Sequence, residues 1–122
     1  MRFVGRIDRL ALGALAEKVV ADEVVLTDER LAHIMQRRAD VYAQYKDSLT
    51  EIVELPDVVI EDPKNEDTIW AIKRYDHHVL IVLKLITSAS DDRKNSIITL
   101  WKMREKAMER HLRTKKVLYK RA

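Results

Sequence analysis

The chain has 122 residues, of which 47% are hydrophobic and 35% charged, and it contains no cysteine. This length predicts a single domain over residues 1–122, and the apolar share excludes a disordered tail. The lack of an apolar run of about 18 residues excludes a membrane-spanning helix, and the lack of cysteine excludes disulfides. Charged residues interrupt the N-terminal apolar residues, so no signal-peptide core is expected and the protein is expected to be cytoplasmic.

The basic residues are concentrated at the C-terminus. Residues 101–122 hold nine Lys or Arg and two Glu, a net charge of +7, whereas residues 1–100 carry a net charge of −4. A basic end on a mildly acidic body predicts attraction to a polyanion, RNA or DNA first. The alternative is a solvated terminal helix whose lysines only keep it soluble.

The first part of the chain predicts one helix and one strand. Apolar residues three and four positions apart over residues 3–15 form one helical stripe. Gly5 and Gly13 weaken this prediction, because each costs a helix about 1 kcal/mol relative to Ala. Residues 23–26 are expected to form a short strand.

Two further helices are expected before Pro56. Thr27 has the side chain of an N-cap, and acidic residues follow it in the first turn. The helix that it begins is expected to bury three residues, Leu31, Ile34 and Met35. A second helix is expected over residues 41–53, and it must end near Leu55 because Pro56 disfavours helical geometry in the residue before it.

The second half of the chain predicts a meander. The expected strands are residues 58–60, 69–75, 79–86 and 96–103, separated by turns at 62–65 and 76–77 and by a loop at 87–95. The third strand is apolar on both faces, so it should be central. The basic segment from Arg104 is expected to be helical and to end in a short extended piece at residues 117–119. Together these elements predict an α+β fold, with N-terminal helices packed on a four-stranded antiparallel sheet.

His33 is the residue that most suggests catalysis. Arg37 lies one helical turn beyond it and is therefore its neighbour. A nearby cation disfavours imidazolium, so His33 is expected to be neutral and able to act as a base. A neutral imidazole can remove the proton of a hydroxyl such as a ribose 2′-OH. The alternative is a histidine on the helix surface without a catalytic task.

Lys84 and the fourth strand carry groups that bind phosphate. Lys84 shares a face with Leu80, Val82 and Ile86, where it either reaches past them to the sheet edge or supplies a fixed charge to a phosphate. Strict alternation places Thr99 with Ile97 and Trp101 on one face and Ser96 with Lys102 on the other. Hydroxyls and lysines bind phosphate and aromatic rings stack bases, although Thr is also a good strand former and Trp is often core. Thr99 and Lys102 line one cleft only if a bulge intervenes.

Several other kinds of site are excluded by spacing. His77 and His78 are adjacent, so on a strand they point to opposite faces and do not share a metal. The chain has no glycine-rich phosphate loop, because Gly5 and Gly13 are its only glycines. Nucleotide-hydrolysing and dinucleotide-dependent enzymes are therefore not expected, and neither a metal nor a cofactor is expected.

Five segments carry a resemblance to a known family. They are VVLTDERLAHI (24–34), LPDVVIED (55–62), VLIVLKLITS (79–88), KNSIITLWK (94–102) and KKVLYK (115–120). In this order and spacing the chain resembles the phage-associated nuclease domains related to barnase, EndoU, colicin and RelE toxins, from about Val4 to Lys120. The resemblance implies N-terminal helices, a four-stranded antiparallel sheet and RNA cleavage without a metal.

The resemblance also implies roles for individual residues. His33 matches the histidine of the helical motif and would be a general base or acid, and Lys84 would hold the scissile phosphate. Ser96 and Thr99 match the NSIIT string and would bind phosphate or orient the substrate. Further phosphate or RNA contacts are expected from Arg37, Arg38, Lys102, Lys116 and Tyr119.

One departure from the family pattern concerns catalysis. The family commonly has a second histidine five residues after the first, often followed by proline, and here these positions are Arg38 and Ala39. Either this change has altered or abolished activity, or Arg38 stabilises the pentavalent phosphate while another group transfers the proton.

Three functions are therefore compatible with the sequence. The first is a metal-independent endoribonuclease, toxin-like or phage-associated, that cleaves RNA by 2′-OH attack and has a possible cognate inhibitor protein. The second is a catalytically degenerate domain that binds nucleic acid without cutting it. The third is a protein-interaction domain of a phage or host assembly. The sequence favours the first and predicts no membrane partner.

Overall fold

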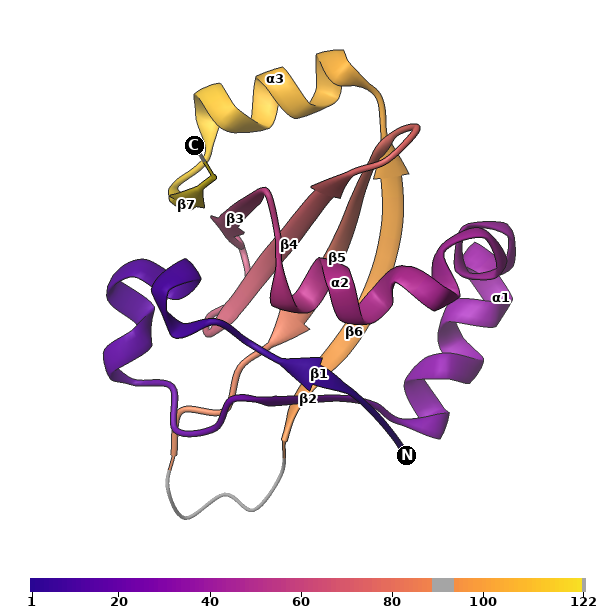
Figure 1. Ribbon diagram of the computed structural model, residues 1–122, viewed down its shortest axis with the longest axis horizontal. Helices are drawn as coiled ribbons and strands as arrows, with labels where there is room; N and C mark the ends of the chain where they lie inside the picture. Colours follow the sequence, from indigo (N-terminus) through magenta and orange to yellow (C-terminus); the bar gives the residue numbers. More distant parts are fainter. Residues whose placement is uncertain (89–93, 122) are drawn as a thin grey trace.

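A seven-stranded mixed sheet forms the centre of the molecule. The computed structural model describes residues 1–88 and 94–121 (Figure 1). In the order β1-β2-β6-β5-β4-β3-β7, the strands are β1 (Arg2–Arg6), β2 (Glu23–Leu26), β6 (Asn95–Met103), β5 (His78–Lys84), β4 (Thr68–Arg74), β3 (Val58–Glu61) and β7 (Val117–Lys120). Three α-helices lie around this sheet: α1 (Asp28–Tyr45), α2 (Leu49–Glu54) and α3 (Glu105–Thr114).

The prediction of a four-stranded antiparallel sheet is wrong, although the α+β class is right. Strands β3 to β6 form the expected antiparallel meander, but β7 extends it beyond β3, and β2 and β1 extend it beyond β6. The pairing of β2 with β6 is parallel, with Val24 opposite Asn95 and Val25 opposite Ser96. The added strands have only four or five residues, and their partners are distant in sequence or unexpected. The extended pieces expected at residues 23–26 and 117–119 are confirmed as β2 and β7, but local patterns did not reveal that they join this sheet or that β1 is a strand.

The helix expected over residues 3–15 is not formed. Residues Arg2–Arg6 form β1, which pairs with β2, and Arg9–Glu17 form an irregular 3-10 helix, η1. A side chain at Gly5 would lie 2.9 Å from the Glu54 Oε2 atom, which also accepts a hydrogen bond from the Arg6 backbone N–H. Gly13 interrupts η1 with a positive φ of 56°. Glycine therefore permits the close approach of Glu54 at position 5 and the left-handed backbone at position 13.

Helix α1 begins as predicted and continues further than predicted. The Thr27 side chain accepts a hydrogen bond from the Arg30 N–H at 3.2 Å, which confirms the N-cap. Ile34 is buried as expected, but Met35 is 46% exposed. The helix continues past a kink at Arg38 to Tyr45, and a 3-10 turn, η2 (Lys46–Ser48), separates it from α2. Helix α2 ends at Glu54, in agreement with the predicted effect of Pro56.

The meander strands match their predicted positions closely. Residues 79–83 of β5 are all buried, and β5 pairs with both β4 and β6, which confirms its central place. The helix and terminal strand expected after Arg104 are α3 and β7. The loop expected at 87–95 falls partly on residues 89–93, outside the described residues, and Asn95 already belongs to β6.

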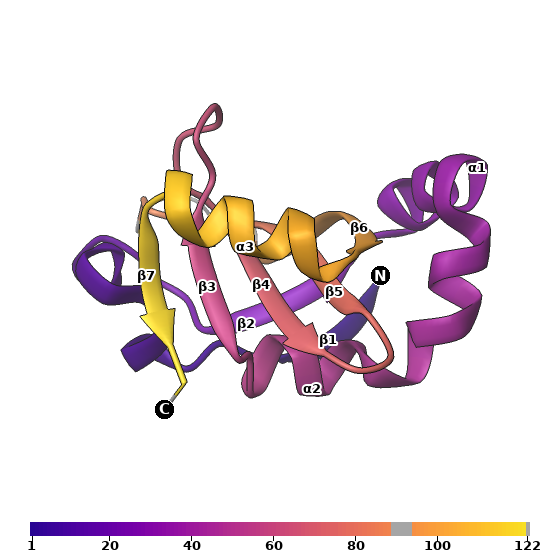
Figure 2. The same ribbon diagram turned by 90° about the horizontal axis from the view of Figure 1, so that it is seen from above.

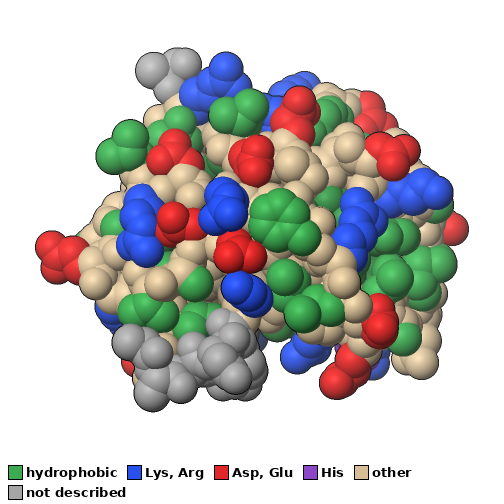
Figure 3. Space-filling model, turned by 60° about the horizontal axis from the view of Figure 1, so that its bottom comes forward, with side chains coloured by type: hydrophobic (Ala, Val, Ile, Leu, Met, Phe, Trp, Pro, Cys, Tyr) green, Lys and Arg blue, Asp and Glu red, His purple; other side chains and the backbone are tan. Residues whose placement is uncertain are grey.

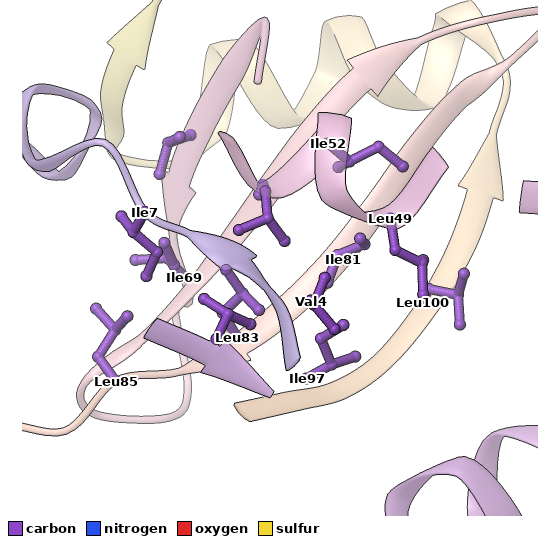
Figure 4. Packing of buried hydrophobic residues seen from close by; sticks show 14 of the residues in the cluster. Val4, Ile7, Leu49, Ile52, Ile69, Ile81, Leu83, Leu85, Ile97 and Leu100 are labelled. Atoms are coloured by element: carbon purple, nitrogen blue, oxygen red, sulfur yellow. The ribbon is translucent and has the colours of Figure 1, made fainter. Parts of the chain in front are cut away.

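Two hydrophobic cores lie on opposite faces of the sheet. The first face, which carries Ile81 of β5, packs against η1, α2 and strands β1 and β2. Figure 4 shows this core, with Val4, Ile52 and Ile97 gathered around Ile81. The second face, which carries Leu80 and Val82, is covered in part by α3. Figure 2 shows α3 crossing β3, β4 and β5, while α1 stands beside β6.

Candidate functional site

A bulge in β6 brings predicted site residues onto one face of the sheet. Lys84 is paired with Ser96, and Val82 is paired with Thr99, but the register shifts between Val82 and Leu83 so that β6 contains an extra residue. Ser96 therefore lies on the second face with Thr99 and Lys84. The expected grouping of Ser96 with Lys102 is wrong, because strict alternation does not hold across the bulge.

The side chains at this corner of the second face are accessible. Lys84 is exposed, and Ser96 and Thr99 are half-buried. The Lys84 ammonium donates one hydrogen bond, 2.9 Å long, to the Glu66 backbone carbonyl. This bond holds the ammonium at the end of β5, and among the described residues it uses one of the three N–H donors of the ammonium. The corner thus combines a positive charge with two hydroxyl groups, the donors that a phosphate needs.

Helix α1 extends this corner from the side of β6. The Arg38 guanidinium lies 5.8 Å from the centroid of the Trp101 ring, within cation–π range. Trp101 is opposite Leu80, so it lies on the second face, and its other ring neighbour is Trp70 at 6.0 Å. Within the described residues, β2 pairs with β6 at Asn95 and Ser96, and α1 packs beside the rest of the strand. Arg38 therefore reaches around this edge to the second face.

His33 and Arg37 are exposed on α1 before the kink. Within the described residues, no hydrogen bond or ion pair joins either of them to Lys84 or to the hydroxyls of β6. The structure thus groups Lys84, Ser96 and Thr99, adds Arg38 by way of Trp101, and leaves His33 facing solvent on the adjacent helix.

The remaining predicted binding residues lie elsewhere. Lys102 is opposite Val79 on the first face, where its ammonium donates to the Gln44 Oε1 atom at 3.2 Å. Tyr119 belongs to β7, four strands from β6 in the sheet order, and Lys116 directly precedes β7. The Lys116 Nζ atom is 3.6 Å from a Glu61 carboxylate oxygen, and Tyr119 packs against the first core. None of the three is grouped with Lys84.

A second cluster of titratable groups was not predicted from the sequence. A hollow of about 370 Å³ at the β4–β5 hairpin is lined by Arg74, Asp76, His77, His78, Met103, Arg104 and Glu105. One oxygen of Glu105 accepts from His78 Nε2 at 2.8 Å and from Arg74 Nη1 at 2.6 Å. The hydrogen bond from His78 is the main cause that lowers the pKa of Glu105. These contacts fasten the start of α3 to the hairpin, and no local sequence signal links Glu105 to residues 27 and 31 positions away.

Asp76, at the same hairpin, is held as a carboxylate. It accepts hydrogen bonds from the Tyr45 hydroxyl and from Gln44 Nε2, the latter at 3.1 Å. The Tyr45 hydrogen bond is the largest cause that lowers the pKa of Asp76 to about 2. Burial, followed by the contact with Asp76, raises the pKa of Tyr45 to about 12. The ionised Asp76 and neutral Tyr45 therefore fasten the end of α1 to the hairpin.

The sequence matches a known family over nearly its whole length. Residues 2–110 match the family described as phage-Barnase-EndoU-ColicinE5/D-RelE like nuclease3. The chain belongs to this nuclease family. No curated protein and no solved structure matches it significantly. The family match includes the β5–β6 corner and α1 but ends before β7, so Lys116 and Tyr119 lie outside the matched part of the nuclease domain.

The surface of this nuclease domain is not uniformly basic. Figure 3 shows one face, on which Lys and Arg side chains are interspersed with Asp and Glu. In residues 1–88 and 94–121 no helix has both the length and the hydropathy needed to cross a membrane. The same residues contain no group of three His, Cys, Asp or Glu side chains placed to hold a metal ion.

Proposed function

We propose that this nuclease-family domain is an endoribonuclease that cleaves RNA by attack of a ribose 2′-OH on the neighbouring phosphodiester, without a metal. The observation that carries the proposal is the β6 bulge, which places the Ser96 and Thr99 hydroxyls beside Lys84 on the second face. Family membership supports nucleic-acid cleavage. The contact of Arg38 with Trp101 supports a role for α1 at the same corner.

In the proposed reaction, the substrate phosphate lies against the β5–β6 corner. Lys84 neutralises the charge that develops on the phosphate oxygens, and the Ser96 and Thr99 hydroxyls donate hydrogen bonds to them. Such donors accelerate the reaction when they bind the pentavalent transition state more tightly than the ground state. Trp101 and Arg38 form the wall next to this position and contact the neighbouring nucleotide.

His33 is the proposed base. Its imidazole takes the 2′-OH proton while the 2′-oxygen forms a bond to phosphorus. The bond from phosphorus to the 5′-oxygen breaks, that oxygen receives a proton from water, and His33 releases its proton to the solvent, which leaves a 2′,3′-cyclic phosphate and a 5′-hydroxyl. Because His33 is exposed on α1 and α1 stands beside β6, the substrate must lie across the β6 edge to contact both. Arg38, at the position of the family's second histidine, stabilises the phosphorane.

Cleavage of a 5′-labelled RNA by the purified protein in EDTA tests this proposal. We expect His33→Ala and Thr99→Ala each to lower the rate at least about tenfold, since a positioned proton-transfer group contributes roughly 10²–10⁴-fold and a hydrogen-bond donor to the transition state contributes about 10²–10³-fold. His77→Ala is the matched control, because His77 is a histidine at the β4–β5 hairpin rather than on α1 or β6. Equal rates for His33→Ala and His77→Ala would contradict the assignment of the base.

A second candidate is a catalytically degenerate domain that binds RNA without cutting it. The observation in its favour is Arg38, which stands where the family commonly has histidine and interrupts α1 with non-helical backbone angles. This candidate predicts salt-dependent RNA binding by wild-type protein and intact RNA under every condition.

A further inference from the structure

The outer surface of α3 carries cations that the fold leaves unpaired. Arg104, Lys106, Arg110 and Arg113 line an open hollow of about 640 Å³ together with Met103, Ala107 and Glu109. Among the described residues, none of these four side chains has an ion-pair partner. Lys106, Arg110 and Arg113 follow one another at spacings of four and three residues, so they lie on one stripe of the helix. Like charges on one stripe repel, and a bound anion removes that repulsion.

Other cations of the C-terminal segment are neutralised by the fold. Lys116 lies 3.6 Å from a Glu61 carboxylate oxygen, and Arg121 lies 3.6 Å from an Asp57 carboxylate oxygen. Lys116 and Arg121, which flank β7, are therefore paired with carboxylates, whereas the four cations at the outer surface of α3 have no ion pair among the described residues. A polyanion is attracted most strongly to charges that have no partner of opposite sign nearby, so α3 is the favoured contact.

A half-buried histidine on the same helix lies within the influence of these positive charges. His111 lies edge-on to Trp70, with ring centroids 5.0 Å apart. Burial is the main cause that lowers the pKa of His111, and the positive charges of Lys115 and Arg110 lower it further. The lowering of the His111 pKa by Lys115 and Arg110 agrees with a surface on which positive charges outnumber negative ones.

The α3 surface continues from the proposed cleavage corner. Strand β6 runs from Thr99 through Trp101 to Met103, and Arg104 leads directly into α3 (Figure 1). At about 3.3 Å per residue along a strand, Thr99 and Arg104 are roughly 16 Å apart. Helix α3 itself is about 15 Å long. An RNA strand that is held at the corner and extends along β6 meets the α3 cations without crossing another strand of the sheet.

We propose that the outer face of α3 is an exosite for the phosphate backbone of single-stranded RNA, which holds the substrate outside the cleavage corner. The inference rests on the proposed function for its location relative to the cut. A flexible single strand follows a short, positively charged track beside an aromatic side chain, here Trp101. The exosite supplies affinity and salt dependence but no base recognition.

Binding of a fluorescent, single-stranded 2′-O-methyl RNA, measured by anisotropy at several salt concentrations, tests the exosite. The methyl group removes the attacking hydroxyl, so binding is measured apart from cleavage. We expect the double variant Lys106→Gln/Arg110→Gln to bind at least tenfold more weakly at low salt. The slope of log K against log salt should fall in magnitude by about 1.4, since each single-strand phosphate contact contributes about 0.7.

The matched control is Lys18→Gln/Arg121→Gln, which removes the same charge from residues paired with Asp67 and Asp57, and we expect less than a twofold change. The variant Lys106→Arg/Arg110→Lys keeps both charges and should retain affinity, which separates charge from folding. Equal losses in the two Gln double variants, an unchanged slope, tighter binding of duplex RNA or no binding by wild type would overturn the exosite. Normal α3-dependent binding with no cleavage of unmodified RNA would instead support the exosite and refute the proposed reaction.

Discussion

Substitution of Asn95 by alanine should destabilise the fold strongly, because this side chain joins three segments. Asn95 is fully buried at the start of β6. Its Oδ1 atom accepts from the Ile86 N–H at 2.8 Å, and its Nδ2 atom donates to the carbonyls of Ala21 and Glu23 at 2.7 and 3.0 Å. The alanine variant loses all three bonds and leaves one buried N–H and two partly buried carbonyls without these partners.

The expected loss follows from the number of bonds. At about 1 kcal/mol for each hydrogen bond, the free energy of unfolding should fall by about 3 kcal/mol. With an unfolding entropy of about 2.1 cal/mol/K per residue, this loss lowers the melting temperature by about 12 °C. Urea unfolding followed by circular dichroism measures the first quantity, and a thermal scan measures the second.

The neighbouring substitution Ser96→Ala is the control for this prediction. Ser96 is half-buried and lies on the second face, so its loss should change stability by less than about 0.5 kcal/mol while it slows RNA cleavage. A loss below about 1 kcal/mol for Asn95→Ala would refute the reasoning, because the three bonds would then contribute little to the junction of β2 with β6.

Three further predictions concern the backbone, acid stability and catalysis. Gly13→Ala should cost about 1–3 kcal/mol, measured by urea unfolding, because Gly13 has a φ of 56° and an added Cβ would lie 3.2 Å from the Leu118 carbonyl oxygen. The pKa of Asp76 is about 2 against a usual 3.8; its ionised form therefore contributes stability above pH 4 that is lost as the pH falls toward 2, and Asp76→Asn should flatten this part of a stability-against-pH curve. Lys84→Ala should lower the cleavage rate by roughly 10²–10³-fold with an unchanged melting temperature, because Lys84 is exposed and stabilises charge on the phosphate.

The sequence predicted the elements whose signals are local. The Thr27 cap, the helix end before Pro56 and the four meander strands each depend on a few neighbouring residues, and the structure confirms them. Strand β1 was mistaken for a helix because its apolar residues also fit a helical stripe. Its extended form depends on pairing with β2 and on the hydrogen bonds that Thr50 and Glu54 of α2 make with its backbone.

The candidate site was predicted residue by residue but not as an arrangement. Alternation along β6 separated Ser96 from Thr99, and only the pairing with β5 reveals the bulge that brings them together. The net charge of the C-terminal segment was also readable from the sequence. Its division into paired and unpaired cations was not, because Glu61 and Asp57, which neutralise Lys116 and Arg121, lie more than fifty residues earlier in the chain.

The most direct test of the proposed function compares two RNAs of the same sequence, one unmodified and one fully 2′-O-methylated. Incubation of each with the wild-type protein in EDTA, followed by mass spectrometry of the product ends, reports the attacking group. We predict cleavage of the unmodified RNA alone, with 2′,3′-cyclic phosphate and 5′-hydroxyl ends. Cleavage of the methylated RNA, or products with 5′-phosphate ends, would contradict attack by the 2′-OH.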